Sequence, residues 1–223
     1  MGHQSAIVVF DIRNFSAHRE LLGLHQNAGP LTRLVVSLLN EAVSGIRRWR
    51  EFCGCVGQPA INHTGDGFIA VIPGEGAGLA ALLFVSEYRE TASRFIREYT
   101  REAIRVEPDV KTLPKLDYGI GIHLGSVQTV SFDDFNGRRR GFLGTAVNLA
   151  CRVEQCTKDH VCNVLCSLRA WDSARKANHG LRMPVFDRYF SKLGQHRLPK
   201  MEQTMTFWEC KKEFHTACKR VRR

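Results

Sequence analysis

The sequence predicts an α+β domain in which helices pack against a sheet that contains antiparallel strands. Three observations lead to this prediction: a β-branched run that ends at Asp11, two long segments with helical spacing of apolar residues, and glycine-containing strand pairs that follow each helix. In chain order these segments contain a βαββαβ pattern, which is a known way of building such a sheet.

The first half of the pattern is defined segment by segment. The first strand is expected at 5–10, where SAIVVF combines β-branched and apolar residues. A helix is expected over 30–52, because apolar residues recur there every three or four positions and Pro30 suits the first helical position. Residues 58–72 predict two strands that meet at the polar, glycine-flanked turn 64–67.

The second half begins with an amphipathic segment over 79–104, which predicts another helix. Residues 116–130 alternate and contain glycines, which favours a second hairpin, and a basic excursion follows over 136–141. The remaining expected elements are a helix over 145–154 and short strands at 161–166, 184–190 and 204–208. The sequence therefore predicts a ferredoxin-like βαββαβ core with additional C-terminal strands, in one domain over 1–210 followed by a basic tail over 211–223.

Composition agrees with one globular protein. Hydrophobic residues make up 43% of the 223 residues and charged residues 24%, which is ordinary for a chain with a buried core. No apolar run approaches the ~20 residues that span a bilayer, and no secretory pattern opens the chain, so we expect a cytoplasmic protein with no membrane partner. The eight cysteines lack zinc-ribbon spacing and are expected to be reduced thiols.

The formal net charge of +10 is unevenly distributed. Half of the excess lies in 211–223, where six basic residues accompany one acidic residue. A solvated chain end is the ordinary interpretation of such a tail. The rest of the excess suits a polyanionic ligand, either a triphosphate or nucleic acid, and charge alone does not choose between them.

Two aspartates lie where metal ligands could meet. Asp11 ends the first strand and Asp66 occupies the tip of the first hairpin. If these strands are neighbours, the two carboxylates face one another at the sheet edge and could hold two divalent cations, which prefer carboxylate and phosphate oxygens. Ordinary turn chemistry is the alternative interpretation of each aspartate taken alone.

Four segments strengthen the metal interpretation. They read FDIxxFS at 10–16, TGDGF at 64–68, YGIGIHLG at 118–125 and GTAVNLACR at 144–152. In this order they resemble the motifs of the class III adenylyl and guanylyl cyclase catalytic domain. The resemblance implies a metal-dependent lyase that closes a nucleoside triphosphate into a 3′,5′-cyclic nucleotide and releases pyrophosphate.

The resemblance implies roles for individual residues. Asp11 and Asp66 would bind two Mg²⁺ or Mn²⁺ ions, with the Ile12 carbonyl as an extra ligand. Asn148 would orient the ribose, and Arg152 would stabilise the negative charge that develops on the α-phosphate. Phosphate binding would fall to backbone N–H groups at a helix start and to two basic side chains, namely Arg13, Asn14, Phe15 and Ser16 for the backbone and Lys200 and Arg138 for the side chains.

In this family the site forms between two catalytic domains, one of which gives the metal aspartates and the other the Asn and Arg. This chain contains both sets. The resemblance therefore implies a head-to-tail homodimer with two composite sites.

The base-reading positions depart from the family. Adenylyl cyclases use a Lys four residues before the second metal Asp and an Asp or Thr seven before the Asn, while guanylyl cyclases tend to use Glu and Cys. These positions hold Asn62 and Gly141, so neither purine pattern is present. Compact cyclases with these departures resemble the pyrimidine cyclases of bacterial antiphage (Pycsar) systems, which make cyclic UMP or cyclic CMP for a separate effector. We expect a pyrimidine substrate, with UTP favoured over CTP.

Four alternatives compete with this interpretation. They are an adenylate or guanylate cyclase, a non-catalytic cyclase-like binding module, a basic nucleic-acid-binding domain, and a diguanylate-cyclase or polymerase-type palm. The complete set of Asp, Asn and Arg argues against the module, and the segment at 144–152 argues against the palm. The absence of a recognisable binding motif argues against a nucleic-acid partner.

Overall fold

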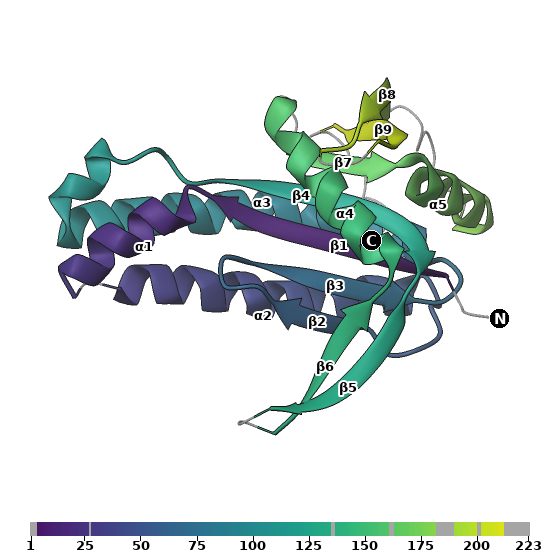
Figure 1. Ribbon diagram of the computed structural model, residues 1–223, viewed down its shortest axis with the longest axis horizontal. Helices are drawn as coiled ribbons and strands as arrows, with labels where there is room; N and C mark the ends of the chain where they lie inside the picture. The colour runs from purple at the N-terminus through teal and green to yellow at the C-terminus, as the bar shows by residue number, and fades with distance from the viewer. Residues whose placement is uncertain are drawn as a thin grey trace.

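The computed structural model describes residues 4–26, 28–134, 137–160, 163–181, 190–199 and 202–211, with the backbone alone at 133–134, 137–140 and 179–181. Its centre is a seven-stranded sheet with the strand order β2-β3-β1-β4-β7-β9-β8 (Figure 1). The mixed α+β architecture predicted from the sequence is confirmed. The expected tail lies outside the described residues, apart from Lys211.

Strand β1 (Gln4–Arg13), which carries the candidate metal ligand Asp11, lies between two other strands of the sheet. It is antiparallel to both of its neighbours, β3 (Gly67–Pro73) and β4 (Asp117–Ser126). Strand β2 (Ala60–His63) extends the sheet beyond β3, and β7 (Val164–Ser167) pairs in parallel with β4. The βαββαβ core is therefore present, with β1 and β3 side by side as expected.

Helices cover both faces of this sheet. The helices α2 (Gly29–Phe52) and α3 (Ala77–Val106) pack on one another and on the face that carries the even-numbered β1 side chains, such as Val8 and Phe10. On the other face, α4 (Thr145–Cys156) packs on the odd-numbered side chains. This division follows from the alternation of side chains along a strand.

The remaining elements join and flank this core. Helix α1 (Phe15–Leu24) precedes α2, and the 3₁₀ turns η1 (Pro108–Thr112) and η2 (Thr157–Asp159) follow α3 and α4. Helix α5 (Leu168–Leu181) and the strands β8 (Phe190–Arg197) and β9 (Thr204–Cys210) complete the described chain. The sequence prediction missed α5 and most of β8, and the strand that it placed at 184–190 falls outside the described residues except for Phe190.

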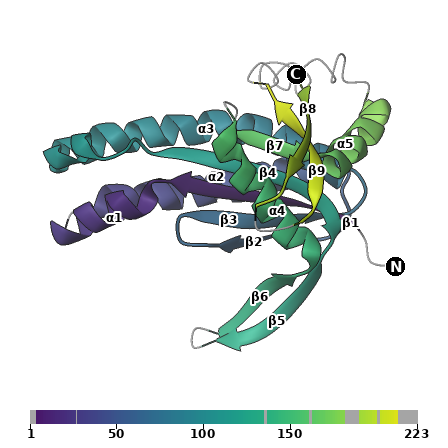
Figure 2. The ribbon, with the colours of Figure 1, turned by 45° about the horizontal axis from the view of Figure 1, so that its top comes forward.

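The predicted hairpin over 116–130 is wrong. Strand β4 pairs with β1 on one side and with β7 on the other, so it has no free edge for the segment that follows. That segment, β5 (Gln128–Asp134), pairs instead with β6 (Gly137–Leu143) in a separate two-stranded sheet. The expected basic excursion is thus a strand, and the β5–β6 hairpin projects from the body of the domain (Figures 1 and 2).

Two further expectations concern side-chain chemistry and membranes. The six cysteines in the described part of the chain are free thiols, as expected. None of the described helices combines the length and the hydrophobicity that a bilayer crossing needs.

We expect Gly67→Ala to lower the free energy of unfolding by about 3 kcal/mol, the upper end for overpacking against atoms that cannot yield. An ideal Cβ at Gly67 would lie 1.9 Å from the backbone oxygen of Phe10, in the neighbouring strand. The control is Gly23→Ala, because a Cβ there meets no heavy atom within 4 Å and alanine favours a helix. Urea unfolding compares the two variants, and equal stabilities would contradict the prediction.

Candidate metal and phosphate site

Asp11 is placed by the alternation of β1. The side chains of Ile7 and Val9 face α4 and are buried, and Asp11 continues the same stripe two residues further along. It lies directly between Gly67 of β3 and Gly119 of β4 in the strand register. Its half-buried carboxylate is therefore flanked on both sides by residues without side chains.

Asp66 reaches the same point from the turn before β3. The Ile12 N–H donates to the Asp66 carbonyl at 3.2 Å, and the Thr64 N–H donates to the Gly67 carbonyl at 3.0 Å. These bonds hold the turn against the end of β1. The structure thus brings the two predicted aspartates close enough for the charge of Asp66 to act on Asp11.

The electrostatics of this pair suit a cation. Burial, followed by the charge of Asp66, raises the pKa of Asp11 to about 6, although Lys158 and Arg13 act in the opposite direction. Two carboxylates that repel one another in a partly buried place match the oxygen ligands that Mg²⁺ and Mn²⁺ prefer. The donor set therefore fits a divalent cation.

Ile12 is also suitably placed for its predicted role. Its side chain is buried, so only its backbone could act. Because the N–H and C=O of one strand residue point to the same side, its carbonyl faces the Asp66 turn to which its N–H donates.

The start of α1 adjoins the aspartates. Asn14 precedes the helix in a left-handed conformation with φ 65°, which asparagine tolerates, and its side chain donates to the Lys115 carbonyl at 2.9 Å instead of capping the helix. The first-turn N–H groups of Phe15 and Ser16 therefore have no side-chain cap. Both residues line a cavity of about 530 Å³ together with Asp66.

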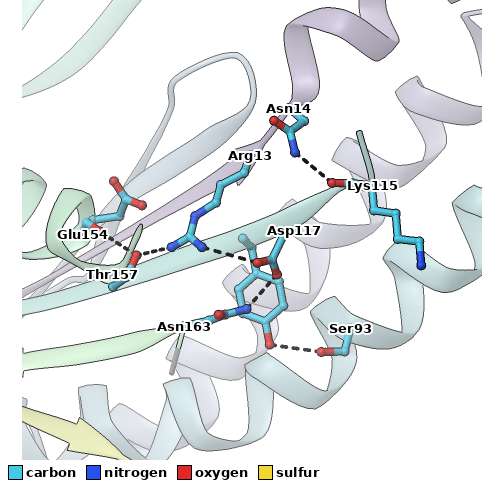
Figure 3. Close-up of polar contacts among 9 residues, drawn as sticks. Arg13, Asn14, Ser93, Lys115, Asp117, Glu154, Thr157 and Asn163 are labelled. Atoms are coloured by element: carbon cyan, nitrogen blue, oxygen red, sulfur yellow. Dashed lines mark hydrogen bonds and ion pairs between the residues drawn. The ribbon is translucent and has the colours of Figure 1, made fainter. Parts of the chain in front are cut away.

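The side chain of Arg13 serves a different purpose. Its guanidinium donates to the Thr157 hydroxyl at 2.5 Å and to the Asp117 carboxylate at 3.3 Å (Figure 3). Asp117 also accepts from Asn163 at 2.7 Å. Arg13 thus ties the end of β1 to η2 and β4, and only its backbone is left for the predicted phosphate contact.

Asn148 and Arg152 lie on a different face of α4 from the residues that contact the sheet. Ala146 and Ala150 pack on β1, and a residue two positions further along a helix points about 200° away. Asn148 is accordingly exposed, and Arg152 donates to Gln155 on its own helix at 2.7 Å. Within the described residues, neither side chain forms a hydrogen bond or an ion pair with Asp11 or Asp66.

The base-reading candidates lie on separate sheets. Asn62 is a half-buried residue of β2, paired with Ile69. Gly141 is in β6, where an ideal Cβ would lie 3.2 Å from Cε1 of Phe132. Of the basic phosphate candidates, Lys200 lies outside the described residues, and Arg138 is described only as a backbone position in β6.

Sequence reasoning missed one residue near the aspartates, Glu154. It is 4% exposed and lies four positions after Ala150 on the sheet-facing stripe of α4. Burial, followed by the charge of Asp11, raises its pKa to about 7. The available signal was the four-residue spacing of 146, 150 and 154, which places the Glu154 carboxylate on the same helix face as two buried alanines.

Comparison with known proteins identifies the fold. No family model and no curated protein matches the sequence. The fold is that of the class III nucleotide cyclase catalytic domain.

Among solved structures, the adenylyl cyclase CyaB from P. aeruginosa matches with a TM-score of 0.66 at 18% identity, over 94% of both chains. The guanylyl cyclase Cya2 matches with a TM-score of 0.56 at 20% identity, also over 94% of both chains. A structure of Trypanosoma brucei adenylate cyclases in their monomeric state matches with a TM-score of 0.58 at 17% identity, over 93% of this chain and 89% of that one. At these identities the likeness establishes the fold.

We expect Asp11→Asn to raise the melting temperature of the metal-free protein at pH 7.5 and to remove the rise that Mn²⁺ produces in the wild type. The raised pKa means that the folded wild type is favoured as the pH falls through the window from about 6 to 3.8. The advantage of the variant should therefore disappear below pH 4, where wild-type Asp11 is also neutral.

Thermal unfolding with and without Mn²⁺ measures both effects. Asp117→Asn is the matched control, because it breaks the contacts to Arg13 and Asn163 and should keep the Mn²⁺ effect. A full Mn²⁺ response in Asp11→Asn would contradict the assignment of the pair as ligands.

Proposed function

We propose that this protein is a metal-dependent nucleotide cyclase that converts a pyrimidine nucleoside triphosphate, UTP in preference to CTP, into a 3′,5′-cyclic nucleotide and pyrophosphate. The observation that carries the proposal is the Asp11–Asp66 pair, which lies beside the uncapped start of α1 and a cavity of about 530 Å³. The cyclase fold gives this pair its functional context.

In this reaction the 3′-oxygen bonds to the α-phosphorus, the bond from the α-phosphorus to the bridging oxygen breaks, and pyrophosphate leaves while the hydroxyl proton passes to solvent. Bound Mg²⁺ or Mn²⁺ would supply charge neutralisation and a lower pKa of the attacking hydroxyl. Asp11, Asp66 and the Ile12 carbonyl would hold the ions. The N–H groups of Phe15 and Ser16 would bind the terminal phosphates at the positive end of α1.

The outward face of α4 supports a homodimer. Asn148 and Arg152 point away from the sheet of their own chain, so a second chain is needed to bring them to a metal pair. The projecting β5–β6 hairpin carries Phe132 and Leu143, which are 52% and 55% exposed, and offers an apolar surface to that second chain. In the composite site, Asn148 would orient the ribose and Arg152 would donate to the α-phosphate oxygens.

Base selection would rest on Asn62 and on the space beside Gly141. The Asn62 amide offers both a donor and an acceptor, which matches the edge of either pyrimidine. Gly141 offers no side chain and therefore neither of the family's purine-reading groups. The same departures support a role in antiphage defence, in which the product acts as a second messenger for a separate effector protein.

Purified protein incubated with Mn²⁺ and each of the four nucleotides should produce mainly cyclic UMP, followed by cyclic CMP. Chromatography with mass spectrometry identifies the product. Dominant turnover of ATP or GTP would overturn the pyrimidine assignment and leave the cyclase assignment intact.

Asp66→Ala should abolish turnover, and Arg152→Ala should lower kcat by about 10²–10³-fold, as expected for a donor to the developing charge.

Mixing two inactive variants tests the composite site. Asp11→Asn and Asn148→Ala should each be inactive alone, because each homodimer has two defective sites. Random exchange of subunits should recover about a quarter of wild-type activity, since half of the dimers are mixed and each mixed dimer has one intact site of two. A mixture that stays inactive after subunit exchange, shown by mass spectrometry of tagged chains, would contradict the dimer arrangement.

A further inference from the structure

Glu154 is a buried carboxylate whose hydrogen bonding is incomplete. The residue is 4% exposed, and its Oε1 atom has no hydrogen-bond partner among the described residues. Figure 3 accordingly shows no contact drawn to the carboxylate, although the Glu154 carbonyl accepts from the Thr157 hydroxyl at 2.6 Å. Such an oxygen is costly unless a donor or a cation reaches it.

The position of this oxygen relative to Asp11 follows from Gly119. An ideal Cβ on Gly119 would lie 2.1 Å from Oε1 of Glu154, so the carboxylate occupies the space that a side chain at 119 would fill. Gly119 is the direct register partner of Asp11. Directly opposed Cβ atoms in antiparallel strands lie about 4.5–5.5 Å apart. Since the Glu154 carboxylate occupies the Cβ position of Gly119, it lies where a cross-strand side chain next to Asp11 would lie.

Helix packing leads to the same position. Ala146 and Ala150 of α4 pack on Ile7 and Val9 of β1. Glu154 is the next residue on that face of α4, and Asp11 is the next residue on that face of β1. The two carboxylates therefore meet at the end of one helix–strand contact.

The nearby cations leave Oε1 unpaired. Arg13 directs its guanidinium to Thr157 and Asp117, so its hydrogen bonds end on other oxygens (Figure 3). Lys158 lowers the pKa of both Asp11 and Glu154 through its charge, and in the described structure it forms no hydrogen bond with either carboxylate. Glu154 therefore lies within the electrostatic reach of Asp11 with an oxygen that no described hydrogen-bond donor reaches.

We propose that Glu154 is an outer-sphere carboxylate of the metal site, whose Oε1 accepts a hydrogen bond from water bound to the cation that Asp11 and Asp66 hold. This inference rests on the metal site of the proposed function. Among the described residues, no three His, Cys, Asp or Glu side chains form a group that could hold a metal ion, so Glu154 is not assigned as a direct ligand. Mg²⁺ usually keeps several of its waters when bound to protein, and such outer partners govern affinity.

Mn²⁺ binding to the nucleotide-free protein, followed by the electron paramagnetic resonance signal of free Mn²⁺, tests the proposal without measuring turnover. Glu154→Gln keeps the side-chain volume and removes the charge, and should weaken Mn²⁺ binding by about 10–100-fold. Gly119→Ala should also weaken Mn²⁺ binding without changing any charge, because the added Cβ displaces the Glu154 carboxylate together with the Thr157 hydroxyl.

The controls separate this role from general stability. Glu107→Gln changes another buried carboxylate, which is 7% exposed and paired with His25 at 3.1 Å, and should leave Mn²⁺ affinity unchanged. Wild-type Mn²⁺ affinity in folded Glu154→Gln would overturn the proposal while leaving the cyclase assignment in place. A wild type that binds no Mn²⁺, or an Asp11→Asn variant that binds it normally, would overturn the metal site itself and this inference with it.

Discussion

The close backbone pairing of β1 with both of its neighbours at Asp11 is the constraint on which the site depends. On one side, Gly67 lets β3 approach until no Cβ fits beside the Phe10 carbonyl, which brings the Asp66 turn to the end of β1. On the other side, Gly119 leaves an open place above β4 that the Glu154 carboxylate enters from α4. The two glycines therefore let the Asp66 turn approach Asp11 from one side and the Glu154 carboxylate approach it from the other.

The sequence predicted the part of this arrangement that depends on local patterns. The β-branched run of β1, the glycine-flanked turn at Asp66 and the helical spacing of α2, α3 and α4 each follow from nearest-neighbour chemistry, and all of them are present. Pairing Asp11 with Asp66 required only that β1 and β3 be adjacent. The resemblance to cyclases then supplied roles that spacing alone could not supply.

The errors arose where tertiary pairing overrides local pattern. The alternation over 116–130 is real, but β4 has no free edge because β1 and β7 occupy both sides, so β5 pairs with β6. The contacts of the Arg13 side chain with Thr157 and Asp117 were not predicted, because they join residues far apart in sequence. Glu154 was missed for the same reason, because its proximity to Asp11 depends on the packing of α4 on β1.

Helix α4 has two chemical faces because of its spacing. One stripe, through Ala146 and Ala150, continues to Glu154 and points to the aspartates of its own chain, while Asn148 and Arg152 point outward. The bond from Arg13 to Thr157 fixes this helix to the strand that carries Asp11. In the proposed dimer, each α4 therefore belongs to both active sites at once.

The contact between Gly141 and Phe132 limits how this protein could change its substrate. A side chain at 141 needs the Phe132 ring to move, because even a Cβ would lie 3.2 Å from it and 3.4 Å from Cγ2 of Val130. An acidic or thiol side chain gained there therefore requires a small shift of the exposed Phe132 ring. In the proposed function, a side chain gained at position 141 would therefore change the base-reading position and the placement of the Phe132 ring together.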